Sequence, residues 1–437
     1  MKKHIRIIIS AGCLVLLAVA WVIVTNSKSA AEKQLVLIDE ATALMSDGIY
    51  IRAVPLLEEA AGLDAKHTRF AESELKRAYM ALIDNRGFPR RYTNLLEKQM
   101  SGRDAQPEIY IEAANYYLNI SKTREALDVL KIGIERTGDA DIQALYENSR
   151  YAFEMSRASY ENVTALFEQT LQVQQGGKWG IVSDDGAVII PFQYDKTSTF
   201  SRDRVIVKDE NNLYAVDKNN NRIAVPYEAT TDFGNFSENR ISLLINGYWR
   251  RATGEFETGA NAFEDFGMYS GGYSAAKVDG RWGVIDISNN WLIPAGFDDI
   301  IRDELGRCYA QGAVFVRIGN VVQLFTKGSF TELVFDDAHP FSDEGFAAVK
   351  LNDKWGFIDI NGTVVIPFVF DEALSFGQHL AAVKFEDLWG YINLSGSIVI
   401  DAVFIEAKSF SGGSAPVLTE RGWQIITLLE YKKGVSL

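Results

Sequence analysis

The stretch of sequence that decides the fold is KWGFIDINGTVVIPFVFD, residues 354–371. Residues 355–359 and 363–366 are rich in aromatic and β-branched side chains, which predicts two short strands. Asn361-Gly362 lies between them and predicts a tight hairpin turn, because both residue types tolerate positive φ. Pro367 has no backbone N–H to donate, so it is expected to end the second strand. The stretch therefore predicts an antiparallel hairpin.

A third strand is expected over residues 380–384, so that one unit is a meander of three short strands. The unit recurs, because Trp355 and Trp389 are 34 residues apart. Steps of 34 to 39 residues in both directions predict eight units, with tryptophan positions at 179, 213, 248, 282, 321, 355, 389 and 423. The longest step predicts an extra loop around residues 302–311. The chain is therefore predicted to carry a β-repeat domain over residues 174–437.

A tryptophan and the glycine that follows it define the repeat. The candidate repeat-defining residues are Trp179, Gly180, Trp282, Gly283, Trp355, Gly356, Trp389, Gly390 and Trp423. Their regular spacing predicts a structural role in which each tryptophan packs between neighbouring units. The alternative is that the rings are exposed platforms on which sugars stack. No residue is predicted to be catalytic or to bind a metal ion or a cofactor.

Aspartates recur sixteen residues after the tryptophan position, at Asp195, Asp298, Asp337 and Asp371. They could form a general acid–base pair, for which two carboxylates about 5–10 Å apart are needed. They could also be a turn device that each unit repeats, because Asp side chains hydrogen bond to nearby backbone. Their equal phase in different units favours the turn device. Residues 359–362, Asp-Ile-Asn-Gly, resemble the start of a calcium loop but also suffice as a hairpin turn.

The repeated pattern K-W-G, then D, G, I-P and F-D, resembles the WG-repeat (KWG) family of bacterial proteins over roughly residues 174–430. This resemblance implies an all-β repeat domain, often joined to membrane anchors or helical modules, with no established enzymatic activity. Eight units could close into a propeller-like ring or form an open, curved array. The sequence leaves both possibilities open.

Residues 31–173 show a helical periodicity instead. Apolar residues recur at three- and four-residue steps on both sides of Gly48 and again from Tyr110 to Gly133. Ala53 and Ala126 take equivalent positions, with room for one helix pair between them. These pairs resemble the tetratricopeptide repeat, which implies stacked helices and a groove that binds peptides. An all-helical spacer is the alternative.

Residues 7–25 are uncharged and follow Lys2, Lys3 and Arg6. A helix of this length spans about 28 Å, which predicts a transmembrane anchor after a cytoplasmic tail of residues 1–6. The flanking cations place the N-terminus in the cytoplasm and the bulk of the chain outside, as a single-pass protein of the cell membrane. A signal peptide cleaved near residues 27–30 is the alternative.

The net charge of −14 over 437 residues disfavours nucleic acid as a partner. The sequence contains no phosphate-binding glycine loop, no G-x-S-x-G and no zinc-ligand spacing. The predicted fold class is a multidomain α plus all-β chain, with a transmembrane helix, tetratricopeptide-like helices and an antiparallel β-repeat array. The predicted function is a membrane-anchored, non-catalytic scaffold for a protein partner, without a cofactor. The alternative is an extracytoplasmic sensor of a ligand such as a glycan.

Overall fold

The structure of this chain, a computed structural model, describes residues 29–226 and 229–431. Its contacts divide it between Asn148 and Ser149 into a helical unit and a unit made of strands. The sequence analysis sets this boundary later, between residues 173 and 174. The difference arises because residues 153–175 contribute three strands to the second unit.

The helical unit confirms the predicted helical segment at the N-terminal side. In the described part of the chain one helix covers residues 29–46. Six more follow: α2 (Tyr50–Gly62), α3 (Thr68–Ala81), α4 (Phe88–Ser101), α5 (Pro107–Asn119), α6 (Thr123–Thr137) and α7 (Ala140–Ser149). Ala53, Ala78, Ala113 and Ala126 are fully buried, so small side chains lie where neighbouring helices meet. At Gly133 a Cβ would lie 2.9 Å from the Tyr110 ring, which shows how closely α5 and α6 approach.

The predicted single-pass topology, and with it the predicted place in the cell membrane, is contradicted in the part of the chain that the structure describes. None of the helices there is long and apolar enough to cross a membrane. The helices α2 to α7 have 10 to 15 residues, whereas a span needs about 20 predominantly apolar residues. The predicted anchor, residues 7–25, and the predicted tail, residues 1–6, lie outside the described residues.

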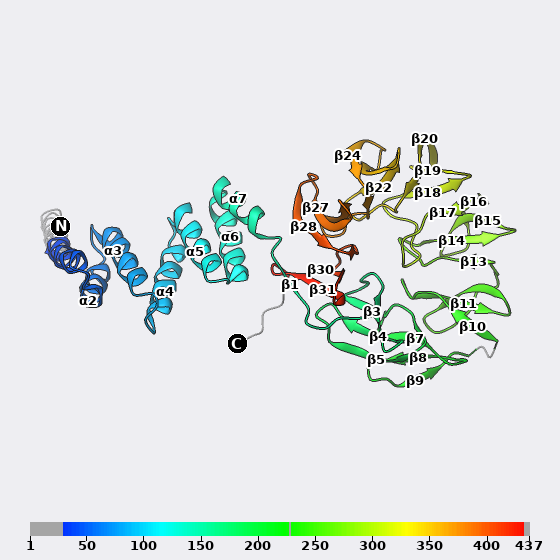
Figure 1. The fold of residues 1–437 in the computed structure, drawn as a ribbon, viewed down its shortest axis with the longest axis horizontal. Helices are drawn as coiled ribbons and strands as arrows, with labels where there is room; N and C mark the ends of the chain where they lie inside the picture. The colour runs from blue at the N-terminus through cyan, green and yellow to red at the C-terminus, as the bar shows by residue number, and fades with distance from the viewer. Residues whose placement is uncertain (1–28, 227–228, 432–437) are drawn as a thin grey trace, which may run out of the picture. The chain divides into compact units, whose positions relative to one another are not determined.

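The described strands form eight separate sheets, which are the blades of a β-propeller (Figure 1). Blade 1 contains β2 (Asn162–Val163), β3 (Thr170–Gln175), β4 (Lys178–Ser183) and β5 (Val188–Tyr194). Blade 2 contains β6 (Lys196–Thr197), β7 (Arg204–Asp209), β8 (Asn212–Asp217) and β9 (Arg222–Ala224). Blade 3 contains β10 (Thr230–Phe233), β11 (Arg240–Ile245) and β12 (Tyr248–Thr253). Blade 4 contains β13 (Asp265–Phe266), β14 (Tyr273–Val278), β15 (Arg281–Asp286) and β16 (Trp291–Phe297).

The second half of the ring repeats this order. Blade 5 contains β17 (Asp299–Ile300), β18 (Ala313–Ile318), β19 (Val321–Thr326) and β20 (Ser329–Phe335). Blade 6 contains β21 (Asp337–Ala338), β22 (Phe346–Leu351), β23 (Lys354–Asp359) and β24 (Val364–Phe370). Blade 7 contains β25 (Glu372–Ala373), β26 (Leu380–Phe385), β27 (Leu388–Asn393) and β28 (Ile398–Phe404). Blade 8 contains β29 (Glu406–Ala407), β30 (Ser414–Thr419), β31 (Gly422–Leu428) and β1 (Phe153–Met155).

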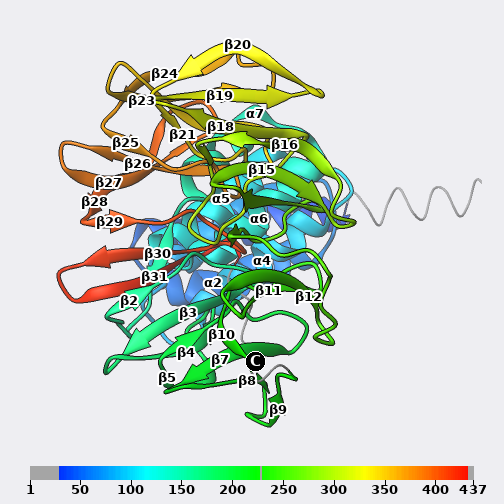
Figure 2. The same ribbon diagram turned by 90° about the vertical axis from the view of Figure 1, so that its right-hand side faces the viewer.

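The first strand of the unit closes the ring. β1 pairs antiparallel with β31, with Phe153 opposite Leu428 and Met155 opposite Ile426, so it supplies the fourth strand of the last blade. Figures 1 and 2 show the blades following one another around a closed ring. The open array that the sequence left as an alternative is therefore wrong.

The predicted three-stranded unit is also wrong, because seven of the eight described sheets have four strands. The extra strand is a two-residue segment such as β25, Glu372–Ala373, which lies between the strands predicted over residues 363–366 and 380–384. It pairs with the second strand of its blade, Ala373 opposite Val383. Two residues are too few to show an alternating pattern, so this strand leaves no periodic signal in the sequence.

The strand register corrects two of the predicted tryptophan positions by one residue. In blade 6 Trp355 lies opposite Phe370, and the matching pairs are Trp249 with Phe263 and Val322 with Phe335. The repeat positions are thus 249 and 322, not 248 and 321. A shift of one residue matters, because it moves a side chain to the other face of the sheet.

Candidate binding site in the propeller

The repeat tryptophans lie on the third strand of their blades. Four of them are buried, and Trp179 and Trp249 are half-buried; the buried ones are Trp282, Trp355, Trp389 and Trp423. Trp355 of blade 6 shares a hydrophobic cluster with Ala373 and Phe376 of blade 7. The rings thus pack between blades and offer little open surface to a sugar.

The glycines that follow these tryptophans lie where the fourth strand crosses the third. A Cβ would lie 2.8 Å from the Ile366 carbonyl oxygen at Gly356, and 2.6 Å from the Ile400 carbonyl oxygen at Gly390. Cβ atoms at Gly180 and Gly283 would meet carbonyl oxygens of β5 and β16 at 2.5 Å. The register shifts at this point, which brings the two backbones close together. Glycine is the residue that permits this approach.

A carboxylate joins neighbouring blades at most of the junctions that the structure describes. In blade 6 Asp371 Oδ1 lies 2.5 Å from Lys354 Nζ, and its carboxylate also accepts a hydrogen bond from the backbone of Glu386 in blade 7. Four further junction carboxylates accept a backbone N–H of the next blade: Glu161, Asp195, Glu264 and Asp298. They stabilise the turn between the second and third strands of that blade.

The recurring aspartates therefore link neighbouring blades through hydrogen bonds. Each of them lies at a different junction, so they do not form a carboxylate pair. The pKa of Asp195 is lowered chiefly by its hydrogen bond from Lys178, and that of Asp371 chiefly by the one from Lys354. The pKa of Asp298 is lowered chiefly by the backbone N–H of Gly319. In blade 5 the register places Asp336, not Asp337, after the paired phenylalanine.

Asp359 serves the hairpin in its own blade. Its Oδ1 accepts the backbone N–H of Asn361 at 2.9 Å and of Thr363 at 2.8 Å. These contacts with the turn lower the pKa of its carboxyl against the opposing effect of burial, which is the largest single influence. Among the described residues no group of three or more Asp, Glu, His or Cys side chains is placed to hold a metal ion.

The junction between blades 7 and 8 departs from this rule. Leu388 takes the position of Lys354, and Ile405 takes the position of Asp371, because Trp389 pairs with Phe404 as the equivalent residues do in blade 6. Phe385 lies directly opposite Leu388 in the neighbouring strand. Phe385, Leu388 and Ile405 are 45%, 38% and 47% exposed and are named here the blade 7 patch. The ion pair and the backbone cap are thus replaced by two exposed apolar side chains, Leu388 and Ile405, which lie beside the exposed Phe385.

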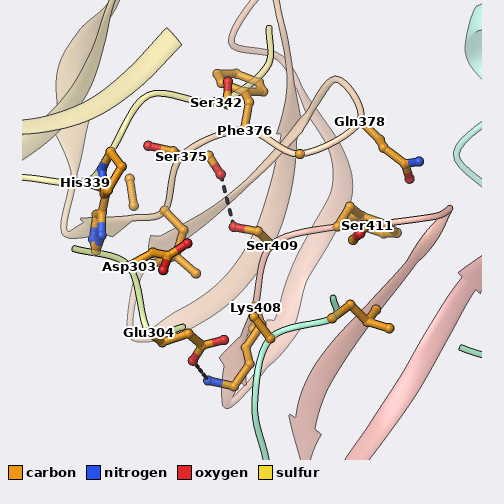
Figure 3. A pocket seen from close by; sticks show the side chains of 18 of the residues that line it. Asp303, Glu304, His339, Ser342, Ser375, Phe376, Gln378, Lys408, Ser409 and Ser411 are labelled. Atoms are coloured by element: carbon orange, nitrogen blue, oxygen red, sulfur yellow. Dashed lines mark hydrogen bonds and ion pairs between the residues drawn. The ribbon is translucent and has the colours of Figure 1, made fainter. Parts of the chain in front are cut away.

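A cavity of about 1050 Å³ adjoins this patch (Figure 3). Residues that directly follow the first strands of blades 6, 7 and 8 line it, among them His339, Ser375 and Lys408. Ser409 Oγ donates a hydrogen bond to the Ser375 carbonyl oxygen at 3.1 Å, which links blades 8 and 7 at the wall. Ile405 of the blade 7 patch also lines the cavity, so the two features are continuous.

The loop after β17 forms another wall. Asp303 and Arg307 close it with an ion pair of 2.6 Å, and the Leu305 carbonyl accepts a hydrogen bond from Asn235 of blade 3. Glu304 reaches Lys408 of blade 8, with 2.5 Å between Oε2 and Nζ, and Figure 3 shows the two side chains pointing toward each other. The loop therefore ties three blades together at the cavity.

Burial shifts the pKa values of two groups at this wall. Burial raises the pKa of the Glu304 carboxyl, with Lys408 opposing the shift, although 39% of the side chain still meets solvent in the cavity. Burial lowers the pKa of His339, whose ring stacks on Trp355 with 5.0 Å between the centroids. Burial therefore favours the neutral form of His339.

None of the cavity residues Glu304, His339, Ser342 and Lys408 is among the sequence-predicted site residues. Of the predicted ones, Trp355 and Trp389 reach the cavity wall. The one sequence signal was the long step between units at 282 and 321, which places a longer loop around residues 302–311. The charged residues of this loop could not be recognised as part of a site from the sequence, because their partners lie far away in the sequence, in blades 3 and 8.

Comparison with known proteins supports the repeat. A family model described as WG containing repeat matches residues 179–214, 282–320, 331–355, 355–389 and 389–423. The chain therefore carries WG repeats at five places in its C-terminal unit, as the sequence predicts. No curated protein matches the chain.

Several solved structures are similar in fold. The WD40 domain of Pan2 from Neurospora crassa is 11% identical with a TM-score of 0.34, over 64% of this chain and 92% of that chain. The β-propeller domain of Cps50 (Swd1) from Myceliophteria thermophila is 11% identical with a TM-score of 0.31, over 53% and 95%. A eukaryotic initiation factor is 12% identical with a TM-score of 0.36, over 64% and 88%.

Proposed function

We propose that this chain is a non-catalytic interaction protein whose propeller binds a partner protein at the blade 7 patch. The observation that carries the proposal is the replacement of the Lys–Asp pair of blade 6 by Leu388 and Ile405. Repeat units tend to keep the residues that stabilise their contacts with neighbours. An exposed apolar cluster where most of the other described junctions hold carboxylates therefore suggests selection for binding.

The hydrophobic effect favours binding at the blade 7 patch. Three adjacent side chains, each between 38% and 47% exposed, gain free energy when a partner covers them. Phe385 supplies an aromatic ring beside Leu388, and aromatic residues are enriched in protein interfaces. The continuity with the cavity gives a partner a place for a protruding side chain. The helical unit, with its tetratricopeptide-like pairs, is proposed as a second interaction surface.

The glycan-sensor alternative has less support. It was based on open tryptophan faces, and four of the six repeat tryptophans are buried while the other two are half-buried. The catalytic alternative needed paired carboxylates, and the recurrent aspartates lie at separate junctions in ion pairs and backbone caps.

A photo-crosslinking experiment with matched positions tests the proposal. The crosslinking amino acid p-benzoylphenylalanine replaces Phe385 in the full chain, expressed in its native cells. The same substitution at Leu351, which occupies the equivalent place in blade 6, is the control. We expect a discrete protein adduct from position 385 and none from position 351.

The second arm restores the repeat. Leu388→Lys with Ile405→Asp gives blade 7 the ion pair of blade 6 while leaving position 385 in place. We expect the adduct at 385 to disappear although the chain still folds. Absence of any adduct at 385, or an adduct that survives this double substitution, would refute the proposal.

A further inference from the structure

We infer that the central cavity is a binding site for an organic cation, an ammonium or guanidinium group. The group could belong to a small amine or to a lysine or arginine side chain of a bound protein. This inference goes beyond the partner binding proposed above and does not depend on it. It rests on the charges, the hydrogen-bonding groups and the rings that line the cavity.

The first argument is an excess of negative charge. Six carboxylates line the cavity: Asp303, Glu304, Asp343, Glu344, Glu372 and Glu406. Four cations line it too, so the wall carries more negative than positive groups. A cavity whose wall has this imbalance attracts a cation, because the protein around it screens charges less than bulk water does.

The second argument is that each cavity cation already has a carboxylate partner. Arg307 pairs with Asp303 at 2.6 Å, Lys384 with Glu372 at 2.8 Å and Lys408 with Glu304 at 2.5 Å. The fourth, Arg302, pairs with Asp299 at 3.1 Å. An incoming anion would have to break one of these pairs.

Three of the carboxylates have no such partner. Within the described ranges, 29–226 and 229–431, no cationic group lies within 4.0 Å of Asp343, Glu344 or Glu406. One Glu344 oxygen accepts the backbone N–H of His379 at 2.8 Å. Burial is the main cause of the raised pKa of the Glu304 carboxyl, and the nearby Glu406 adds a smaller contribution. These acceptors can receive the N–H groups of a ligand.

A buried hydroxyl gives independent support. Ser342 lines the cavity directly before Asp343, is only 8% exposed, and its Oγ has no hydrogen-bond partner among the described residues (Figure 3). A buried polar atom without a partner is costly, which suggests that a ligand satisfies it. Ammonium and guanidinium groups carry donors only, so they match a hydroxyl oxygen and carboxylates.

Aromatic rings complete the wall. Tyr309, Phe376 and Trp389 line the cavity; Tyr309 is half-buried, and the other two rings are buried. This propeller already uses rings to hold cations, since the Arg302 guanidinium lies 3.9 Å from the Trp282 ring centroid and Lys408 Nζ lies 5.1 Å from that of Trp423. An aromatic wall favours a cation over an anion through the negative face of the ring.

Isothermal titration calorimetry on the full chain tests the inference. The probes are spermidine, N-acetyl-lysine amide and N-acetyl-arginine amide, with N-acetyl-norleucine amide as the neutral control. We expect saturable binding of at least one cationic probe and none of the norleucine amide. Tighter binding of spermidine indicates a free amine as the natural ligand, and tighter binding of an amino-acid amide indicates a side chain.

Matched charge variants locate the site. Asp343→Asn with Glu406→Gln removes two cavity carboxylates, and Glu332→Gln with Asp401→Asn removes two exposed ones on the outer strands β20 and β28. We expect about tenfold weaker binding or more for the cavity pair and less than about twofold for the outer pair. Thermal unfolding of each variant confirms that it folds.

The overturning results are distinct from those of the partner proposal. The inference fails if no cationic probe binds, if the neutral amide binds as tightly, or if the cavity pair leaves the affinity unchanged. None of these outcomes affects the adduct expected at position 385. Conversely, the presence or loss of that adduct does not bear on the calorimetric measurement, which uses the chain without the blade 7 substitutions.

Discussion

Blades 6 and 7 share one backbone frame and differ on one part of their surface. In both, the repeat tryptophan lies opposite a phenylalanine of the fourth strand, Trp355 with Phe370 and Trp389 with Phe404. The register shifts directly after the tryptophan in both blades. The two blades differ in the side chains at the junction with the next blade. Blade 6 has the ion pair of Lys354 and Asp371 there, and blade 7 has the blade 7 patch.

The difference teaches which positions of the repeat serve the fold and which are available for binding. In both blades the tryptophan fills the space beside the next blade, and the glycine lets two strands cross, so these two positions serve the fold. The lysine and aspartate positions lie on the exposed rim, where an ion pair contributes little to stability. A blade can therefore exchange them for apolar side chains and keep its frame.

The largest expected effect comes from removing the shared tryptophan. Trp355→Ala and Trp389→Ala should each lower the free energy of unfolding of the propeller by about 3–5 kcal/mol, because a large buried ring leaves a cavity. Urea unfolding of the full chain, followed by circular dichroism, measures it. Trp291→Ala is the control, since this ring lies on the outer strand β16, is 40% exposed, and should cost about 0.5 kcal/mol or less. Unequal losses in blades 6 and 7 would show that their frames differ.

The next effect comes from the shared glycine. Gly356→Ala and Gly390→Ala place a methyl group within 2.9 Å of the crossing strand and should each cost about 1–3 kcal/mol, because the backbone must move to make room. Gly296→Ala is the control, because its Cβ would meet its nearest neighbour at 3.8 Å. The same unfolding measurement applies. A tolerated alanine at 356 or 390 would contradict the crossing as the reason for the Trp-Gly motif.

The repeat and its helical companion could be predicted from the sequence because both recur. Trp-Gly at a period of 34 residues predicts units, and small residues at helical steps predict helix pairs. Ring closure could not be predicted, because it depends on β1, three residues that pair with β31 at the other end of the unit. A segment of three residues has no period of its own. The one-residue slips at 249 and 322 were missed because neither unit keeps the Trp-Gly pair.

The candidate site was less predictable for the same reason. Glu304 and Lys408 meet across the cavity although 104 residues separate them, and neither belongs to a motif. Ile405 could have been singled out, since it stands where the repeat places an aspartate. Departures from a repeat are visible in sequence only after the phase is known, and their exposure is visible only in the fold.

A smaller effect comes from exchanging the surfaces of the two blades. Lys354→Leu with Asp371→Ile should give blade 6 an apolar patch, and Leu388→Lys with Ile405→Asp should remove the patch from blade 7. Because the frame is unchanged, both variants should unfold at nearly the wild-type urea concentration. Binding of the fluorescent dye 8-anilinonaphthalene-1-sulfonate should rise in the first variant and fall in the second, since it reports exposed apolar surface. Equal dye binding by both would contradict the equivalence of the two positions.

The smallest effect should appear in acid. The fold lowers the pKa of Asp371 below its ordinary value of 3.8, chiefly through the hydrogen bond from Lys354. This carboxylate therefore stabilises the propeller at pH values above 3.8. This stabilisation is lost as the pH falls from 3.8 through the lower pKa that Asp371 has in the folded state. The Lys354→Leu, Asp371→Ile variant should therefore lose slightly less thermal stability than the wild type between about pH 5 and pH 2, and the Leu388→Lys, Ile405→Asp variant slightly more. Added salt should narrow these differences, because the ion pair is exposed. An acid response that is the same in all three proteins would contradict a lowered pKa of the carboxylate at this position.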